Sequence, residues 1–396
     1  MVSRLKTSFK KIGSIMKHYI ETRHKKFITD FETIVNIDSS SDNKGGIERV
    51  ARFFEDRFKN IGLDTEILFL GENKVPCLYA EHRPSKKPFD IMFMGHMDTV
   101  FPFGEVKKRP FSIKGNKAFG PGVCDMKGGL LVVLHVLETL KHEGFLDSLS
   151  VCVAFNGDEE TGSNASKEWI MSTAKKSRRT FVFEPCRPGY RFVLQRKGGG
   201  WFHVIAKGQE AHAGADPEKG INAVVELAHQ IVEINKLNQN NMETSAQVTV
   251  ITGGDKVNII PNRAEARIDV RILKLEEKER IETFFKTLSE HPYLKGSEIT
   301  IQGGINRPPM EPGDATHKLW ELIRSTGKKI DLPMEWISTG GCSDGNYTSA
   351  AGTPTIDGMG IVGANSHRAD EYAELGSIDN MVLLVAQVCR AIGEKD

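Results

Sequence analysis

Apolar positions change their spacing along the chain in a way that predicts helices layered on a sheet. Apolar residues three and four positions apart predict helices near residues 15–36 and 47–60. Shorter apolar runs predict strands at 65–70, 77–81 and 89–94, and the later runs LSVCVAFN and TFVF predict two more buried strands. The run LLVVLHVLETLKHEG between these two groups predicts a long apolar helix. Helices and buried strands that alternate in this way predict an α/β domain.

A second pattern begins after Lys197 and the three glycines that follow it. The runs WFHVIAKG, INAVVELAHQIVEINKL, AQVTVITG, AEARIDVRIL, EEKERIETFFKTL and EITIQGG come in the order β-α-β-β-α-β. This is the order of a ferredoxin-like α+β domain. Helices predicted at DATHKLWELIRSTGKK and from about residue 377 to 392 then return to the first pattern. We therefore expect a domain of residues 199–306, inserted between residues 1–198 and 307–396 of the α/β domain.

Composition excludes some partners and indicates a compartment. A chain of 396 residues is too long for one core, which agrees with two domains. The 53 Lys and Arg residues against 52 Asp and Glu residues leave a net charge of +1, so no overall field attracts nucleic acid or an anionic membrane. The six cysteines lack CxxC spacing, which favours reduced thiols over a disulfide framework. We therefore expect a cytoplasmic protein.

The start of the chain is basic, but it does not have the pattern of a targeting or spanning segment. Residues 1–26 lack the unbroken apolar stretch and the cleavage site of a secretory signal. No run in the chain approaches the about 18 uninterrupted apolar residues of a transmembrane helix, so no span is expected. A basic amphipathic helix lying on a membrane is one interpretation of this start. We favour the other, a solvated leader helix that packs against the domain.

Polar residues of metal-binding type follow three of the predicted strands. His96 and Asp98 come just after the strand at 89–94, Glu159 and Glu160 follow LSVCVAFN, and Glu184 follows TFVF. Any one of these could be an ordinary solvated strand end. Ligand groups in α/β sheets gather at the carboxyl ends of the strands, so three such ends together favour a metal site. Asp98 is placed to accept the second ring N–H of His96.

Two further candidates complete the set. Asp125 lies between the glycine-rich stretch GNKAFGPGVC and the long apolar helix, where an N-capping aspartate is the alternative interpretation. His367 lies in SHRADEY near the end of the chain. Imidazole and carboxylate ligands suit hydrolytic zinc, and five ligands are too many for one ion that keeps an open position. Two ions that share Asp125 satisfy the count, and Glu159 then remains as the general base. The five predicted ligands are His96, Asp125, Glu160, Glu184 and His367.

At this point the sequence resembles the family of dinuclear zinc metallopeptidases that contains glutamate carboxypeptidase, succinyl-diaminopimelate desuccinylase and aminoacylase, and the glutamate carboxypeptidase branch most closely. The resemblance implies a catalytic domain with a mixed central sheet flanked by helices. It implies two Zn²⁺ ions, for which Co²⁺ or Mn²⁺ can substitute, and a cis peptide bond at Asp125–Met126. One ion would be held by Glu160, His367 and Asp125, and the other by His96, Glu184 and Asp125. The motifs that carry the resemblance are GHMDTVFPFG, GPGVCDMKGG, DEETGS, FEP, GQEAHAG, VNIIPN, DVRI and SHRADEY.

The resemblance also assigns a role to the inserted domain, as the lid and the surface of a homodimer. His212 in GQEAHAG would reach a neighbouring active site and support the developing oxyanion, whereas the residues alone favour a turn histidine. Asn258, Arg271 and Arg307 match positions that contact the terminal carboxylate of the substrate, although Arg271 could equally pair with a surface carboxylate. The sequence departs from the motifs of this family at two places, in SHRADEY and in GGCSDGN, and both lie on the side of the site that faces the substrate.

The function expected from these residues is hydrolysis of an amide bond next to a free C-terminal carboxylate, in a small peptide or an N-acyl amino acid. Three alternatives stay open. The chain could be an N-acyl amino acid deacylase or desuccinylase, an aminopeptidase or dipeptidase on the same scaffold, or a binding module without catalysis. Glu184, where aminopeptidase-type relatives usually have aspartate, favours carboxypeptidase or deacylase action.

Overall fold

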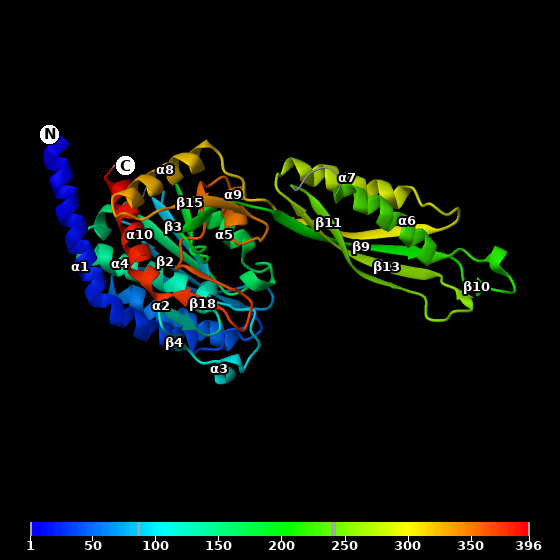
Figure 1. Ribbon diagram of the computed structural model, residues 1–396, viewed down its shortest axis with the longest axis horizontal. Coiled ribbons are helices and arrows are strands. Elements are labelled where there is room, and N and C mark those ends of the chain that lie inside the picture. The colour runs from blue at the N-terminus through cyan, green and yellow to red at the C-terminus, as the bar shows by residue number, and fades with distance from the viewer. Residues whose placement is uncertain (1, 85–87, 239–242, 395–396) are drawn as a thin grey trace. The chain divides into compact units, whose positions relative to one another are not determined.

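The chain divides into two compact units. The computed structural model describes residues 2–84, 88–238 and 243–394, with the side chains of residues 2–13 outside the description. The first unit comprises Met1–Leu194, Pro312–Ser338 and Ser343–Asp396, and the second comprises Gln195–Glu311 and Thr339–Cys342 (Figure 1). In the sequence, the second unit is thus inserted into the first.

The first unit is built on a six-stranded mixed sheet. Its strand order is β1-β2-β6-β3-β7-β16. The pairs β1–β2 and β2–β6 are antiparallel, whereas β6, β3, β7 and β16 run parallel. This confirms the predicted mixed central sheet. The strands are β1 (Asp64–Leu70), β2 (Val75–His82), β3 (Ile91–His96), β6 (Val151–Asn156), β7 (Thr180–Val182) and β16 (Thr355–Ile356).

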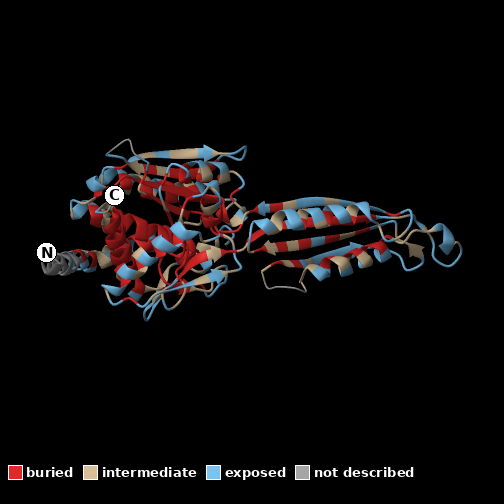
Figure 2. Ribbon diagram, turned by 90° about the horizontal axis from the view of Figure 1, so that it is seen from above, coloured by how far each residue is buried: buried red, intermediate tan, exposed pale blue. Residues whose placement is uncertain are grey.

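Both faces of this sheet are covered, and for that reason its central strands consist of unbroken apolar runs (Figure 2). Along β3, Ile91 and Phe93 point into the larger core, and Met92 and Met94 into the smaller one. The larger core receives apolar residues from α1 (Val2–Val35), α2 (Lys44–Asn60), α4 (Gly128–His142), α8 (Asp314–Lys328) and α10 (Ile378–Gly393). The smaller core receives residues from α5 (Lys167–Ala174) and α9 (Gly345–Ala350).

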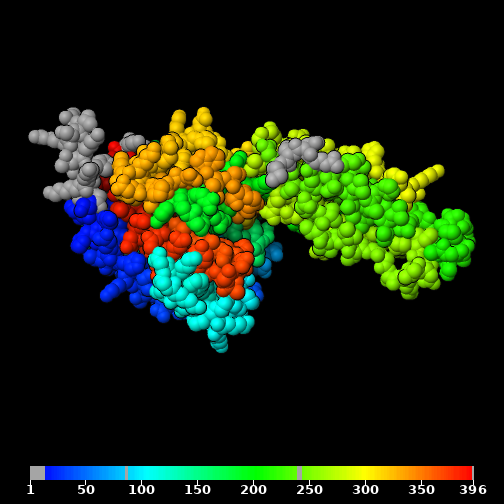
Figure 3. All heavy atoms as spheres, viewed as in Figure 1, coloured from blue at the N-terminus to red at the C-terminus, as the bar shows by residue number. Residues whose placement is uncertain are grey.

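Smaller elements complete the first unit. A four-stranded sheet has the order β17-β18-β5-β4, and it brings residues near 115 beside residues near 370 (Figure 3). The strands β8 and β15 pair separately. The bounds are α3 (Glu105–Lys108), β4 (Ser112–Lys114), β5 (Lys117–Phe119), β8 (Arg191–Arg196), β15 (Glu335–Thr339), β17 (Gly363–Ala364) and β18 (Tyr372–Glu374).

Helix α1 is longer than predicted, since it begins at Val2 rather than near residue 15. Its residues Met16, Ile20, Phe27 and Phe31 are buried in the larger core, which is the packing expected of a leader helix. The basic side chains before residue 14 lie outside the described part. By length and composition, one helical stretch among the described residues, Leu375–Gly393, could cross a membrane, but 72% of its apolar window is buried in the structure. A core helix gives the same signal.

A buried ion-pair network ties α1 to α2 and α4. Asp30 accepts from Lys26 Nζ at 2.6 Å and from Arg57 at 2.6 Å, and His135 of α4 lies beside it. Burial alone would raise the pKa of Asp30, but the nearby His135 ring, the hydrogen bond from Lys26 and the charges of Lys26 and Arg57 lower it to about 2. This carboxylate therefore stabilises the fold in its charged form.

We expect Asp30→Asn to lower the free energy of unfolding by about 1–3 kcal/mol at pH 7, because Arg57 and Lys26 lose the charge of Asp30, and only Lys26 keeps a second carboxylate nearby among the described residues, Glu138. The folded pKa of Asp30 lies below its usual value near 3.8, so its contribution is complete above pH 4 and is lost as the pH falls toward 2. Urea unfolding at pH 7 and pH 3 should show a smaller pH dependence in the variant. Glu21→Gln on the same helix, in an exposed pair with Lys17, is the control and should change stability by less than about 0.5 kcal/mol.

The second unit is a four-stranded antiparallel sheet with two helices on one face. Its strand order is β11-β13-β9-β14. Alternate residues of β9 and β13 pack with α6 and α7 in one apolar core, centred on the stacked rings of Phe202 and Phe285. This confirms the predicted ferredoxin-like domain. The elements are β9 (Gly198–Lys207), β10 (Ala211–His212), α6 (Ala223–Asn235), β11 (Ser245–Gly253), β12 (Ile259–Ile260), β13 (Arg263–Ile272), α7 (Glu276–Glu290) and β14 (Glu298–Arg307).

Candidate metal centre

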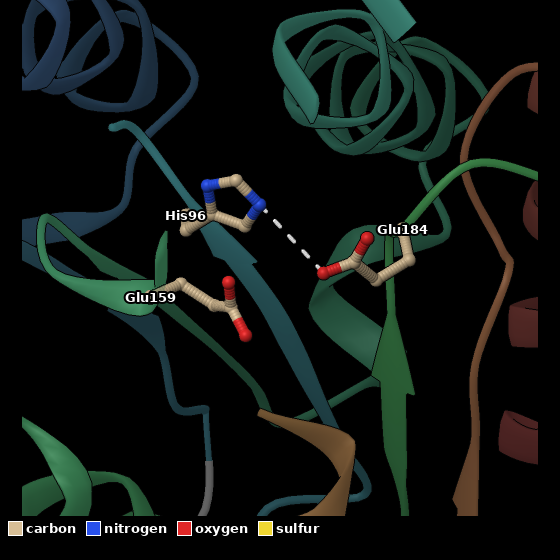
Figure 4. Close-up of side chains that lie close together, drawn as sticks. All are labelled: His96, Glu159 and Glu184. Atoms are coloured by element: carbon tan, nitrogen blue, oxygen red, sulfur yellow. Dashed lines mark ion pairs between the residues drawn. The ribbon is translucent and has the colours of Figure 1, made fainter. Parts of the chain in front are cut away.

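Three neighbouring parallel strands end at the same edge of the first unit's sheet. His96 is the last residue of β3, Glu184 follows β7, and Glu159 and Glu160 follow β6. The side chains of His96, Glu159 and Glu184 point toward a shared space, and each offers a ligand atom within 4.8 Å of the others (Figure 4). The sheet order therefore brings together residues that are far apart in sequence.

Asp125 lies between two histidines, with one oxygen toward each. Its Oδ1 is 3.2 Å from His96 Nε2, and its Oδ2 is 3.3 Å from His367 Nε2. Each histidine also meets a second carboxylate, since His96 Nε2 lies 3.6 Å from Glu184 and His367 Nε2 lies 3.2 Å from Glu160. The Asp125–Met126 peptide bond is cis, as predicted. All five predicted ligands thus meet in two groups that share Asp125.

The charge and hydrogen bonding of this cluster fit divalent cations. Glu160 Oε1 is buried and has no hydrogen-bond partner among the described residues. Burial raises the pKa of Glu160 to about 7, and the charge of Asp125 adds to this effect. The hydrogen bonds with Asp125 and Glu160 raise the pKa of His367 to about 10. Closely spaced buried carboxylates carry a desolvation cost that a bound cation would offset.

Asp98 supports both the histidine and the glutamate pair. Nδ1 of His96 lies 3.0 Å from the Asp98 backbone oxygen and 3.4 Å from its Oδ1, so the Nδ1 proton has acceptors and the Nε2 lone pair faces the cluster. The same carboxylate accepts the backbone N–H groups of Glu159 at 3.2 Å and Glu160 at 3.1 Å, and the Ser41 hydroxyl at 2.7 Å. Asp98 is fully buried. Asp98 therefore contacts His96 mainly through its backbone oxygen, and its carboxylate fixes the backbone of Glu159 and Glu160.

Sequence reasoning missed Glu371. This fully buried residue accepts the backbone N–H groups of Gly122 at 3.1 Å, Cys124 at 2.7 Å and Asp125 at 2.9 Å. Burial and the charge of Asp125 raise the pKa of its carboxyl group to about 8, against the effect of these hydrogen bonds. The only signal in the sequence is a second carboxylate in SHRADEY, four residues after His367.

The second unit places His212 and Asn258 side by side. Strand β10, which ends at His212, pairs with β12, and Ala213 donates its N–H to the Asn258 carbonyl at 2.9 Å. His212 Nδ1 accepts the N–H groups of Gly214 at 3.2 Å and Ala215 at 3.0 Å. The neutral ring therefore carries its proton on Nε2, and the exposed side chain can donate it.

Arg271 and Arg307 lie at the other end of that sheet, where both pair in register with Gly199. Lys207, at the His212 end of β9, is eight residues further along, which is about 25 Å in an extended strand. Arg271 binds both oxygens of Asp269, at 2.9 and 3.0 Å, which is the pairing that the sequence left open as an alternative. Within one copy of the second unit, Arg271 and Arg307 therefore lie far from His212 and Asn258.

The sequence is similar to those of known hydrolases. A model of the peptidase family M20/M25/M40 matches residues 92–391. Carboxypeptidase G2 from Pseudomonas sp. (strain RS-16) is 31% identical over 378 residues, which cover 92% of this chain and 89% of that protein. A succinyl-diaminopimelate desuccinylase from Gluconacetobacter diazotrophicus is 27% identical over 339 residues, or 81% of this chain and 86% of that protein.

Solved structures share the fold over nearly the whole chain. Aminopeptidase PepT from Bacillus cereus has a TM-score of 0.77 at 21% identity, over 93% of this chain and 98% of that chain. A protein from Bacillus subtilis described as a dinuclear metal-binding peptidase has a TM-score of 0.69 at 11% identity, over 95% of this chain and 99% of that chain. These likenesses establish the two-domain fold.

Proposed function

We propose that this chain, which belongs to the peptidase family M20/M25/M40, is a dizinc hydrolase that cleaves an amide bond next to a free C-terminal carboxylate. The observation that carries the proposal is Asp125, a buried carboxylate with one oxygen toward His96 and the other toward His367. A carboxylate placed in this way can bridge two ions. The relative that is 31% identical is a carboxypeptidase, which supports this substrate class.

Each ion would have one histidine, one terminal carboxylate and the shared Asp125. Glu160 and His367 would hold one, and His96 and Glu184 the other, an assignment that rests on the groups seen in the cluster. When bound, a pair of divalent ions acidifies water and polarises a carbonyl group. Zinc suits these nitrogen and oxygen ligands, with Co²⁺ or Mn²⁺ as substitutes. Burial raises the pKa of the Cys124 and Cys186 thiols, which disfavours thiolate ligands, and neither cysteine is among the proposed ligands.

Glu159 would be the general base. Its buried carboxyl group shares the space of His96 and Glu184 but is not one of the five ligands in this assignment. It would take the proton of the attacking water and pass it to the leaving nitrogen. Asp98 would act indirectly, because it would position His96 and Glu159 through its hydrogen bonds to the His96 ring and the backbone N–H of Glu159.

Two copies would cooperate through their second units. His212 and Asn258 lie at one end of the sheet, and Arg271 and Arg307 at the other, so only two copies could offer both pairs to one substrate. Strand β11 is an edge strand that exposes Val250 and Ile251, and α6 exposes Val232. An edge strand with exposed apolar residues suits pairing with a second copy. We therefore propose a homodimer in which Arg271 and Arg307 bind the substrate carboxylate. The six free cysteines support a cytoplasmic location.

A substrate panel tests the proposed activity. Metal-free protein reloaded with zinc or cobalt should hydrolyse N-acyl amino acids with a C-terminal glutamate at least about tenfold faster, in kcat/KM, than the matching dipeptides with a free amine, a difference of about 1.4 kcal/mol. Preference for N-succinyl substrates would favour the desuccinylase alternative, which the 27% identical relative supports. Preference for free amines would favour an aminopeptidase. Two bound ions with no turnover of any substrate would leave a binding module.

A further inference from the structure

Two loops of the first unit meet at one buried carboxylate that is not among the five ligands. We call residues 120–127 the Asp125 loop and residues 363–371 the His367 loop. Glu371 ends the His367 loop, and its two oxygens accept three N–H groups of the Asp125 loop, at 2.7 to 3.1 Å. The N–H of Asp125 itself is one of the three. The spacing of the two loops therefore depends on this side chain.

The ligands of the cluster differ in how their backbones are held. His96 ends a strand that is paired on both sides, by β6 and β7. Glu184 follows β7, and its backbone carbonyl accepts the N–H of Gly360 at 3.0 Å. His367 lies in an irregular segment between β17 and β18, and its side chain is 54% exposed. Backbone bonds such as Arg368 to Asn365 stay inside its own loop. Sheet pairing thus fixes His96 and Glu184, whereas loop contacts hold His367 and the shared Asp125.

We propose that Glu371 is a positioning residue that sets the spacing of His367 and Asp125 and thereby controls occupancy of the ion position formed by Glu160, His367 and Asp125. This inference rests on the two-ion centre of the proposed function. The position formed by His96, Glu184 and Asp125 keeps two ligands that the sheet fixes, so it depends less on Glu371. Glutamine at 371 would turn an amide N–H₂ toward backbone N–H groups, because only one of its two terminal atoms is an acceptor.

Zinc binding measured by equilibrium dialysis tests this selectivity without any turnover assay. Wild-type protein should bind two equivalents. Glu371→Gln should bind one of them about 10 to 100 times more weakly, which is the range for loss of an outer-shell partner, and the other within about threefold of wild type. Equal weakening of both equivalents, or of neither, would overturn the proposal.

Two further variants make the result specific. Glu374→Gln applies the same chemical change in β18, at a carboxylate with no hydrogen bond to the Asp125 loop among the described residues, and should bind both equivalents normally. In a His367→Ala background, Glu371→Gln should cause no further loss, since the same ion is already missing. A further loss in the double variant would place the effect at the other ion.

Folding and function are checked separately. If Glu371→Gln does not fold, Glu371→Asp keeps the carboxyl group on a shorter side chain and should show the same selective weakening. If neither variant folds, Glu371 supports the whole unit and the selective role is wrong. Wild-type protein that binds two ions and hydrolyses nothing would remove the proposed function, but it would leave the role of Glu371 intact.

Discussion

Replacing Glu159 with alanine should leave both zinc ions bound and lower kcat by about 10²–10⁴-fold, the usual contribution of a general base. The reason lies in the division of the carboxylates. Asp125, Glu160 and Glu184 meet the two histidines, whereas Glu159 shares their space without a place in the assigned ligand set. Its removal should therefore affect proton transfer more than metal binding. The measurements are zinc content per chain and steady-state kinetics on the best substrate of the panel.

The matched control is Glu168→Ala, an exposed carboxylate on α5 in the same part of the chain. It should keep both zinc and activity. A Glu159→Ala enzyme with near wild-type kcat would exclude this residue as the base. A variant that loses zinc together with activity would instead make Glu159 a ligand, because the effect on kcat would then follow metal occupancy.

Strand ends were the part of the site that the sequence could predict. His96, Glu160 and Glu184 follow runs of buried apolar residues, and parallel strands bring such positions to one edge, where the structure places them. The ferredoxin-like unit could be predicted equally well. The spacing of its apolar residues indicates each strand and helix in turn, in the order in which they occur along the chain. Both features could be predicted because apolar residues repeat at a fixed spacing within each strand and helix.

Contacts between loops could not be predicted in the same way. Glu371 holds the Asp125 loop across 246 residues of sequence, and nothing in the period or spacing of SHRADEY marks that bond. The pairing of Asp30 with Arg57 depends on how two helices pack, and a helix pattern leaves that open. For Arg271, the sequence left two partners possible, the carboxylate of the substrate and a surface carboxylate. In the structure, Arg271 donates two hydrogen bonds to the carboxylate of Asp269.

Replacing His212 with alanine should lower kcat by about 10²–10³-fold, which is the effect of losing one preorganised oxyanion donor. The ring is prepared for donation, since Nδ1 accepts two backbone N–H groups and the proton stays on Nε2. Zinc content should not change, because His212 is not one of the proposed ligands. KM should change less than kcat, since the donor would bind charge that develops only in the transition state.

Mixed dimers show which copy supplies this histidine. If His212 serves the neighbouring copy, a dimer of one Glu159→Ala chain and one His212→Ala chain contains one intact site, built from Glu159 of one chain and His212 of the other. Random reassociation of equal amounts makes half of the dimers mixed, so the mixture should regain about one quarter of the wild-type activity. If His212 serves its own copy, each site in the mixed dimer lacks one residue and the activity stays at that of the separate variants. The His212 and Asn258 end of the second unit would then belong to the site of its own chain, and the proposed exchange between two copies would be wrong.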